Sequence, residues 1–223
     1  MGFGMRHIYY GFLFKIWRRK RFELFVKLIR PRPTDRLLDV GGEPHNWLQF
    51  PPVVGKIDLL NLKAPNWNPT TAPAYAIDAL VGDGCKMTFT DASYDIAFSN
   101  SVLEHVGSWE KQQAFAAEIR RVGKSLWVQT PAYESPIETH FLGLGLHWLP
   151  MRMRKLAVRW LSLWGWMERR NKTETDEFVE SIRLLTKKEM HQLFPDCEVR
   201  TEKYFGLIPK SHIAVRKIVS SEQ

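Results

Sequence analysis

The sequence has few cysteines, no long apolar run and no signal-peptide pattern, and each absence excludes a class of protein. No uncharged apolar stretch approaches the roughly 20 residues that cross a bilayer, and no cleavage pattern follows the basic start. The two cysteines, Cys85 and Cys197, have no Cys or His nearby at ligand spacing. These absences exclude a disulfide scaffold and a cysteine-based zinc site, and we expect a protein of the reducing cytoplasm.

Disorder and repeat architecture are excluded as well. The hydrophobic fraction is 44% and the charged fraction 25%, which is the balance of a folded globular chain. With 223 residues and no internal repeat or low-complexity tract, the chain can bury a sizeable core.

The net charge of +8 is concentrated in two segments. Residues 1–36 hold ten Lys and Arg against Glu23 and Asp35, and residues 146–172 hold seven against Glu168. The rest of the chain is net negative. We therefore expect a basic N-terminal helix over residues 1–33 and an acidic domain over 34–223, interrupted by a basic insertion at about 134–180.

Both basic segments carry apolar residues at helical spacing. In the first, a stripe from Ile8 to Trp17 resumes at Leu24, and Pro31 ends the helix. One face of the second carries Met153, Leu156, Trp160, Leu163, Trp164 and Met167, and the opposite face carries Arg152, Lys155, Arg159 and Ser162. Residues 7–30 and 149–172 could therefore lie on an anionic membrane, or pack on the domain as a terminal helix and a lid. No nucleic-acid-binding motif accompanies the charge, so we expect no nucleic-acid partner.

The stretch "DRLLDVGGEPHNW", residues 35–47, is an apolar strand that ends in two glycines. Gly41 and Gly42 lack the Cβ atoms that would keep the backbone away from a ligand. The pair could simply end the strand in a turn, or it could be the first loop of a nucleotide-type cofactor site. The pattern Gly-x-Gly-x-x-Gly is absent, and Pro44 stiffens the loop.

Strands and helices alternate along the rest of the chain. The stretch "VVGKIDLLNL" (53–62) is the second strand. A further strand at 94–99 precedes a helix that begins near Leu103, and "KQQAFAAEIRRV" is helical. "KSLWVQTPA" is a strand, "TKKEMHQLFP" a short helix, and "CEVRTEKYFG" with "KSHIAVRK" a terminal antiparallel pair. The alternation predicts an α/β fold with a doubly wound, mostly parallel sheet of seven strands, and a ligand at the carboxyl ends of the strands.

The order "LLDVGG", "IDLLNL", "VGDG", "SYDIAFSNSVLEHV" and "SLWVQTP" resembles the class I S-adenosylmethionine-dependent methyltransferases. The resemblance covers residues 34–133 and resumes at "LLTKKEMHQLFPDCEV". It implies a Rossmann-like fold and S-adenosylmethionine as the cofactor. The residues that match the family's cofactor-binding positions are Asp39, Gly41, Gly42, Asn61, Asp83, Gly84, Ser99 and Asn100.

Two of these positions carry particular expectations. Asn61 stands where the family usually has an acid that accepts from both ribose hydroxyls, and an amide keeps only one acceptor oxygen. Asp83 matches the residue that accepts from the adenine amino group. Each could instead be a turn residue.

Three residues are candidates for the chemistry. His140 is the preferred general base, because it follows the fifth strand where the acceptor pocket should open, with Glu138 as its orienting carboxylate. His105 is either a second base or part of the pocket wall. We expect no metal, because Glu138 and His140 have no evident third ligand.

The sequence thus predicts O-methylation of a small or lipid-linked amphipathic acceptor, by an enzyme that is cytoplasmic or peripheral on the inner face of the membrane. Two alternatives remain. The altered glycine loop and Asn61 also suit a binding module without activity. The basic segments also suit a nucleic-acid methyltransferase, although "SNSV" stands where the "PPY" signature of base methylation would be expected.

Overall fold

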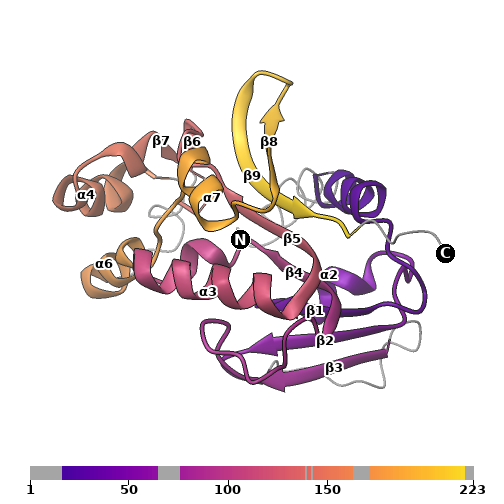
Figure 1. Cartoon of the computed structure of the whole chain (residues 1–223). Coiled ribbons are helices and arrows are strands. Elements are labelled where there is room, and N and C mark those ends of the chain that lie inside the picture. Colours follow the sequence, from indigo (N-terminus) through magenta and orange to yellow (C-terminus); the bar gives the residue numbers. More distant parts are fainter. Residues whose placement is uncertain (1–16, 65–75, 139, 142, 163–170, 219–223) are drawn as a thin grey trace, which may run out of the picture.

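The computed structural model describes residues 17–64, 76–138, 140–141, 143–162 and 171–218. Seven strands form one sheet in the order β3-β2-β1-β4-β5-β9-β8 (Figure 1). They are β1 (Arg36–Val40), β2 (Lys56–Asn61), β3 (Ala76–Val81), β4 (Tyr94–Asn100), β5 (Gly123–Pro131), β8 (Glu198–Tyr204) and β9 (Ile208–Arg216). The first five are parallel, and β9 runs antiparallel to both β5 and β8. The predicted fold class, including the antiparallel terminal pair, is confirmed.

Helices cover both faces of the sheet. The helical segments are residues 17–29, α2 (Pro44–Leu48), η2 (Leu103–His105), α3 (Trp109–Val122), η3 (Leu146–Trp148), α4 (Met151–Leu161), α6 (Lys172–Glu180) and α7 (Lys187–Leu193). Consecutive buried residues of a strand point to opposite faces of the sheet. Leu37 packs with Phe25 and Trp47 on one side, whereas Leu38 packs with Phe115 and Met190 on the other.

The N-terminal helix is part of the core. Phe25 is buried and its ring meets those of Trp47, Phe98 and Trp127 edge-on at centroid distances of 6.2, 5.3 and 5.6 Å. Arg21 forms a half-buried ion pair with Glu202 of β8 at 2.8 Å. The apolar stripe of residues 17–29 is therefore covered by the domain, and residues 1–16 lie outside the described residues.

The helix expected to begin near Leu103 starts six residues later. Residues 103–105 form only a 3₁₀ turn, and Gly107 follows with φ of 106°. Ser108 then caps α3 by accepting a hydrogen bond from the Lys111 amide. The interruption leaves Glu104 and His105 on a short turn beside the sheet.

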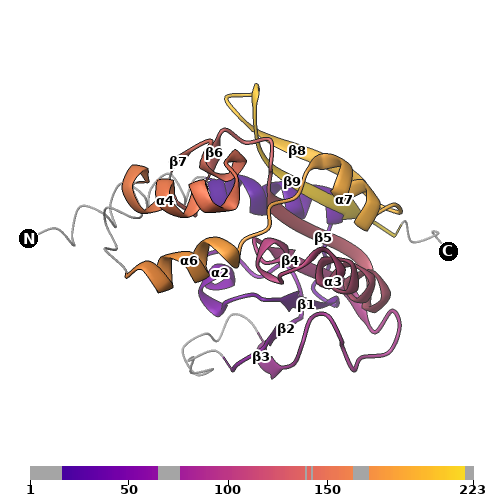
Figure 2. The same ribbon diagram turned by 90° about the vertical axis from the view of Figure 1, so that its left-hand side faces the viewer.

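The insertion after β5 folds into a lid with a small core of its own. It contains a two-stranded sheet of β6 (Ile137–Glu138) and β7 (Gly143–Leu144), followed by η3, α4 and α6. Phe141, Ala157, Val158 and Val179 are buried together there. Figure 2 shows α4 and α6 lying together beside the sheet. No helix among the described residues is both long and apolar enough to span a bilayer.

Replacing Phe25 with Ala should lower the free energy of unfolding by about 3–5 kcal/mol, because the substitution leaves a cavity among three aromatic rings. Denaturant titration measures the change. Arg19→Ala, which removes an exposed ion pair with Glu23 on the same helix, is the control and should have little effect. Equal stability of Phe25→Ala and the wild type would mean that the helix does not belong to the core.

Candidate functional site

A cleft of about 900 Å³ opens at the carboxyl ends of β1, β2 and β3. Four of the predicted cofactor residues line it: Gly41, Asn61, Asp83 and Gly84. His105 lies on its wall as well. The cleft is where a parallel α/β sheet binds its ligand, as the sequence predicted.

Both glycines of the first loop are required by their surroundings. Gly41 has φ of 80°, and a Cβ atom there would lie 2.5 Å from the side chain of Val102. A Cβ atom on Gly42 would lie 1.8 Å from Oδ2 of Asp39. The loop therefore lies directly against β1 and the turn after β4, which leaves the cleft open.

Asp39 is buried behind this loop. Its Oδ2 accepts a hydrogen bond of 2.7 Å from Nε1 of Trp47, and its Oδ1 has no hydrogen-bond partner among the described residues. Burial raises the pKa of the Asp39 carboxyl to about 7; the Trp47 hydrogen bond opposes this rise and the nearby charge of Glu43 adds to it. The carboxyl does not line the cleft itself. Its unsatisfied oxygen suits a donor reached from the cleft, such as an ammonium or a bridging water.

Asn61 is the last residue of β2, and Asp83 lies in the turn after β3. The Nδ2 atom of Asn61 donates to the carbonyl oxygen of Gly42 at 2.9 Å, so the amide is oriented with its oxygen as the acceptor. Oδ1 of Asp83 accepts from the Cys85 amide at 2.8 Å. This contact fixes the Gly-Asp-Gly turn at the mouth of the cleft.

Ser99 and Asn100 lie elsewhere. Ser99 is fully buried and donates to the carbonyl oxygen of Val40 at 2.9 Å, which ties β4 to β1. Asn100 accepts a hydrogen bond of 3.1 Å from Arg21 of the N-terminal helix. Neither side chain lines the cleft, because the alternation of β4 points Asn100 toward the opposite face of the sheet.

A second cleft, of about 580 Å³, lies between the lid and the end of β5. Its lining combines apolar groups such as Phe141 and Met151 with Glu138 and Arg154. Arg154 donates to the carbonyl oxygens of His147 and Leu149, its Nε atom is buried without a partner among the described residues, and burial lowers its pKa. No carboxylate pairs with Arg154 in the described part of the chain. The cleft thus offers an apolar wall and a half-buried cation.

Four titratable side chains meet between the two clefts. His140 Nδ1 lies 2.6 Å from Oε1 of Glu138, and His140 Nε2 lies 3.7 Å from Oε1 of Glu104. The rings of His105 and His140 are edge-to-face with centroids 4.9 Å apart. The structure therefore brings together all three predicted catalytic residues. Glu104, which is fully buried, was missed as a site residue although it belongs to the quoted Leu-Glu-His turn.

The pKa values of the two histidines are shifted in opposite directions. Burial opposes charge on His140, but the carboxylates of Glu104 and Glu138 outweigh it and raise its pKa to about 9. Burial lowers the pKa of His105, and the nearby carboxylates only partly offset it. His140 in this arrangement holds its proton at neutral pH and is not a free base. We expected no metal because the sequence shows no third ligand near Glu138 and His140. The fold brings two further possible ligands, Glu104 and His105, next to His140.

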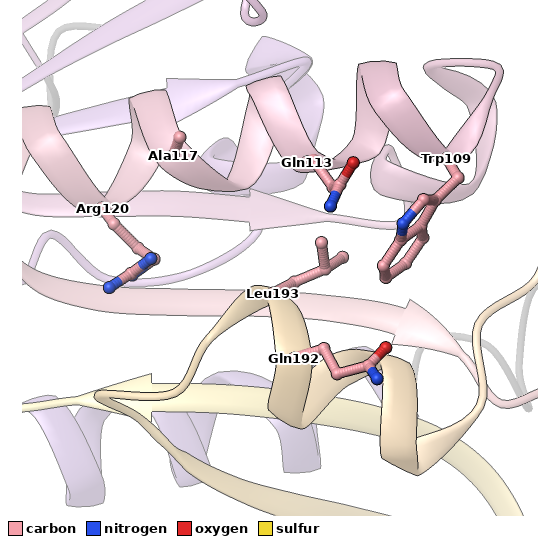
Figure 3. A pocket seen from close by; sticks show the side chains of 6 residues that line it. All are labelled: Trp109, Gln113, Ala117, Arg120, Gln192 and Leu193. Carbon is pink, nitrogen blue, oxygen red and sulfur yellow. The ribbon is translucent and has the colours of Figure 1, made fainter.

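A separate hollow between α3 and α7 has no part in this arrangement (Figure 3). Trp109, Gln113, Ala117 and Arg120 line it from α3, and Gln192 and Leu193 line it from α7. Arg120 is paired with Asp196 at 2.6 Å. None of the predicted cofactor residues lines this hollow, so it is not a candidate for the cofactor.

Replacing Asp39 with Asn should change how stability depends on pH. The folded pKa of about 7 lies above the ordinary value of 3.8, so the wild type loses stability as pH rises from about 4 through 7. The amide of the Asp39→Asn variant does not ionise. We expect the difference in melting temperature, variant minus wild type, to be larger at pH 8 than at pH 5. The same difference at both pH values would contradict a raised pKa for Asp39.

Comparisons with known proteins indicate a methyltransferase fold. Residues 55–126 match the family model described as a methyltransferase domain. Among the curated proteins, none matches the sequence significantly. Solved structures with the same fold include a protein of Bordetella parapertussis described as a possible exported protein, at 15% identity and a TM-score of 0.55. That match covers 90% of this chain and 68% of that one.

Two further structures share the fold over most of both chains. The putative methyltransferase in complex with the Trm112 activator of Haloferax volcanii is 14% identical, with a TM-score of 0.53 and coverage of 92% of this chain and 91% of that one. An S-adenosylmethionine-dependent methyltransferase of Aquifex aeolicus is 14% identical, with a TM-score of 0.50 and coverage of 89% and 88%. The chain thus has the fold of the S-adenosylmethionine-dependent methyltransferases, and residues 55–126 match a methyltransferase domain.

Proposed function

We propose that the protein transfers a methyl group from S-adenosylmethionine to an oxygen of a small or lipid-linked amphipathic acceptor at a membrane surface. The observation that carries the proposal is the cluster of four titratable side chains between the two clefts. The first is lined by the glycine loop, and the second by the lid. His105 lines the first and Glu138 the second, and His140 contacts both of these side chains as well as approaching Glu104.

The residues of the first cleft fit the cofactor. The bare backbone at Gly41 and Gly42 admits its amino-acid end, and Oδ1 of Asp39, which has no partner among the described residues, is an acceptor for the ammonium, directly or through water. The amide oxygen of Asn61 accepts from a ribose hydroxyl, and Asp83 stands where the adenine amino group would donate. When bound, the cofactor supplies a methyl group already activated by its sulfonium charge. Ser99 and Asn100 have structural contacts, and we leave them out of the cofactor site.

The protein then has to align the acceptor and keep water away. Alignment matters most in such a reaction, because holding two reactants in line removes a large entropic cost. Phe141 and Met151 offer the acceptor an apolar wall, and Arg154 offers a cation for an acidic group such as a carboxylate or phosphate. His105, Glu138 and His140 lie where the reacting oxygen would arrive. An acceptor with an apolar body and an acidic group fits this cleft best.

Helix α4 supports a membrane location. The side chains of Leu156 and Trp160 are about two thirds exposed, at 64% and 66%, although the helix packs Ala157 and Val158 onto the lid core. The exposed Arg159 guanidinium lies over the Trp160 ring, 5.6 Å from its centroid. Exposed Trp and Leu beside Arg are typical of a helix in an anionic membrane interface. Leu163, Trp164 and Met167 of the predicted stripe lie outside the described residues.

The helix of residues 17–29 does not expose an apolar face of this kind, because its apolar side chains pack on the sheet. We therefore assign the membrane contact to α4 rather than to the N-terminal helix. The lid would then hold its cleft next to the lipid, where a lipid-linked acceptor is available.

Isothermal titration with S-adenosylhomocysteine tests the cofactor site. We expect micromolar binding by the wild type and about tenfold weaker binding by Asn61→Ala, which removes one hydrogen-bond acceptor. Asp78→Ala is the matched control, because it removes an exposed side chain of β3 outside the cleft. A folded wild-type protein that binds neither S-adenosylmethionine nor S-adenosylhomocysteine would contradict the proposal and leave a binding module without the cofactor.

Flotation with anionic vesicles tests the membrane contact. The wild type should float with vesicles that contain phosphatidylglycerol and should float less at high salt. Replacing both Leu156 and Trp160 with Ser should abolish flotation, whereas Val81→Ser, an equally exposed apolar residue of β3, should leave it unchanged. If the wild type stays with the unbound fraction, α4 is only the outer surface of a lid.

A further inference from the structure

We infer that Glu104, His105 and His140 form a site for a divalent transition-metal ion, such as Mn²⁺ or Zn²⁺, at the junction of the two clefts. Each residue offers one ligand atom, and the three atoms lie within 4.8 Å of one another. Glu104 Oε1 is 3.7 Å from His140 Nε2 and 4.0 Å from His105 Nε2. Ligands that share an ion at 2.0–2.2 Å lie about 3–4 Å apart, so a small inward movement closes the site.

Glu104 carries the clearest sign that something is missing from this cluster. The side chain is fully buried, and its Oε1 atom, the one that faces both histidines, has no hydrogen-bond partner among the described residues. A buried carboxylate oxygen without a partner is costly. An ion bound at this atom would remove the cost.

The charge of the cluster also suits a cation. Glu104 and Glu138 are both buried carboxylates. Within the described ranges, the partners of these two carboxylates at ion-pair distance are histidines, with no Lys or Arg among them. A divalent ion with two neutral imidazoles balances two carboxylates.

The groups around the three ligands hold them in place. Glu138 Oε1 contacts His140 Nδ1 at 2.6 Å, which leaves Nε2 for the ion, and Glu138 Oε2 accepts from the Phe141 amide at 2.6 Å. Thr130 Oγ1 donates to Oε2 of Glu104 at 2.9 Å, which leaves Oε1 for the ion. A carboxylate behind a metal-binding histidine is the usual outer support of such ligands. Two imidazoles and one carboxylate favour a transition metal over Mg²⁺ or Ca²⁺, which prefer oxygen ligands.

The location of the metal site between the two clefts gives the ion a role in the proposed reaction. This role rests on the proposed function, whereas the binding of the ion does not. His105 lines the cofactor cleft, and Glu138, which supports His140, lines the acceptor cleft. Three protein ligands leave coordination positions for an acceptor hydroxyl, whose pKa falls on binding the ion. The O–H bond breaks and the proton leaves to solvent. An O–C bond then forms as the C–S bond to the sulfonium breaks, so one proton is released for each methyl transferred.

Calorimetry of the full chain with MnCl₂, after dialysis against a chelator and in the absence of cofactor, tests the site. We expect one ion per chain, with at least tenfold weaker binding by His140→Ala. Glu138→Gln keeps the shape of the supporting side chain and should weaken binding about 10- to 100-fold. His191→Ala, an exposed histidine of α7, should bind like the wild type. Circular dichroism checks that each variant is folded.

The outcomes separate this site from the cofactor site. Failure of the folded wild type to bind Mn²⁺ or Zn²⁺, or equal affinity in His140→Ala, overturns the metal site. If S-adenosylhomocysteine still binds in the presence of chelator, the proposed function survives that result. Stoichiometric Mn²⁺ binding that depends on His140, by a protein that does not bind S-adenosylhomocysteine, would support the metal site and contradict the proposed function.

Discussion

The burial of β1 and β4 on both faces is the constraint on which the rest of the structure depends. These two strands lie side by side at the centre of the sheet, and their side chains fill the cores on either side. Because the strands are parallel, their carboxyl ends meet at one edge. β1 carries Asp39 and ends at Val40, just before the glycine loop, and β4 is followed by the turn that holds Glu104 and His105. The polar groups of the site are thus placed together by packing that is mainly apolar.

Much of this could be predicted from the sequence, because it depends on local patterns. Alternating apolar runs and glycine turns indicate a doubly wound sheet, and the residues after each strand indicate which side chains reach the cleft. Contacts between distant segments could not be predicted in the same way. Asn100 belongs to a strand end that looks like a cofactor position, but it faces Arg21 of the N-terminal helix, 79 residues away. The contact of Glu104 with Thr130 depends on the pairing of β4 with β5, and its approach to His140 depends on how the lid folds back over β5.

The lid has two surfaces with different chemistry. Its inner side joins the acceptor cleft, where Arg154 is half-buried without a carboxylate in the described part of the chain. Its outer side exposes Leu156 and Trp160 on α4. The same short helix thus carries a half-buried cation on its inner side and exposed apolar side chains on its outer side. In the N-terminal helix the apolar residues stabilise the fold, so similar sequence patterns have different uses in this chain.

The most direct test of the account is a crystal structure of the protein grown with S-adenosylhomocysteine. The account predicts the ligand in the cleft of about 900 Å³, with its amino-acid end at the Gly41–Gly42 loop, its ribose at Asn61 and its adenine at Asp83. The sulfur should point toward the junction at His105 and His140. An empty cleft at saturating ligand, or a ligand whose sulfur points away from that junction, would contradict the central claim.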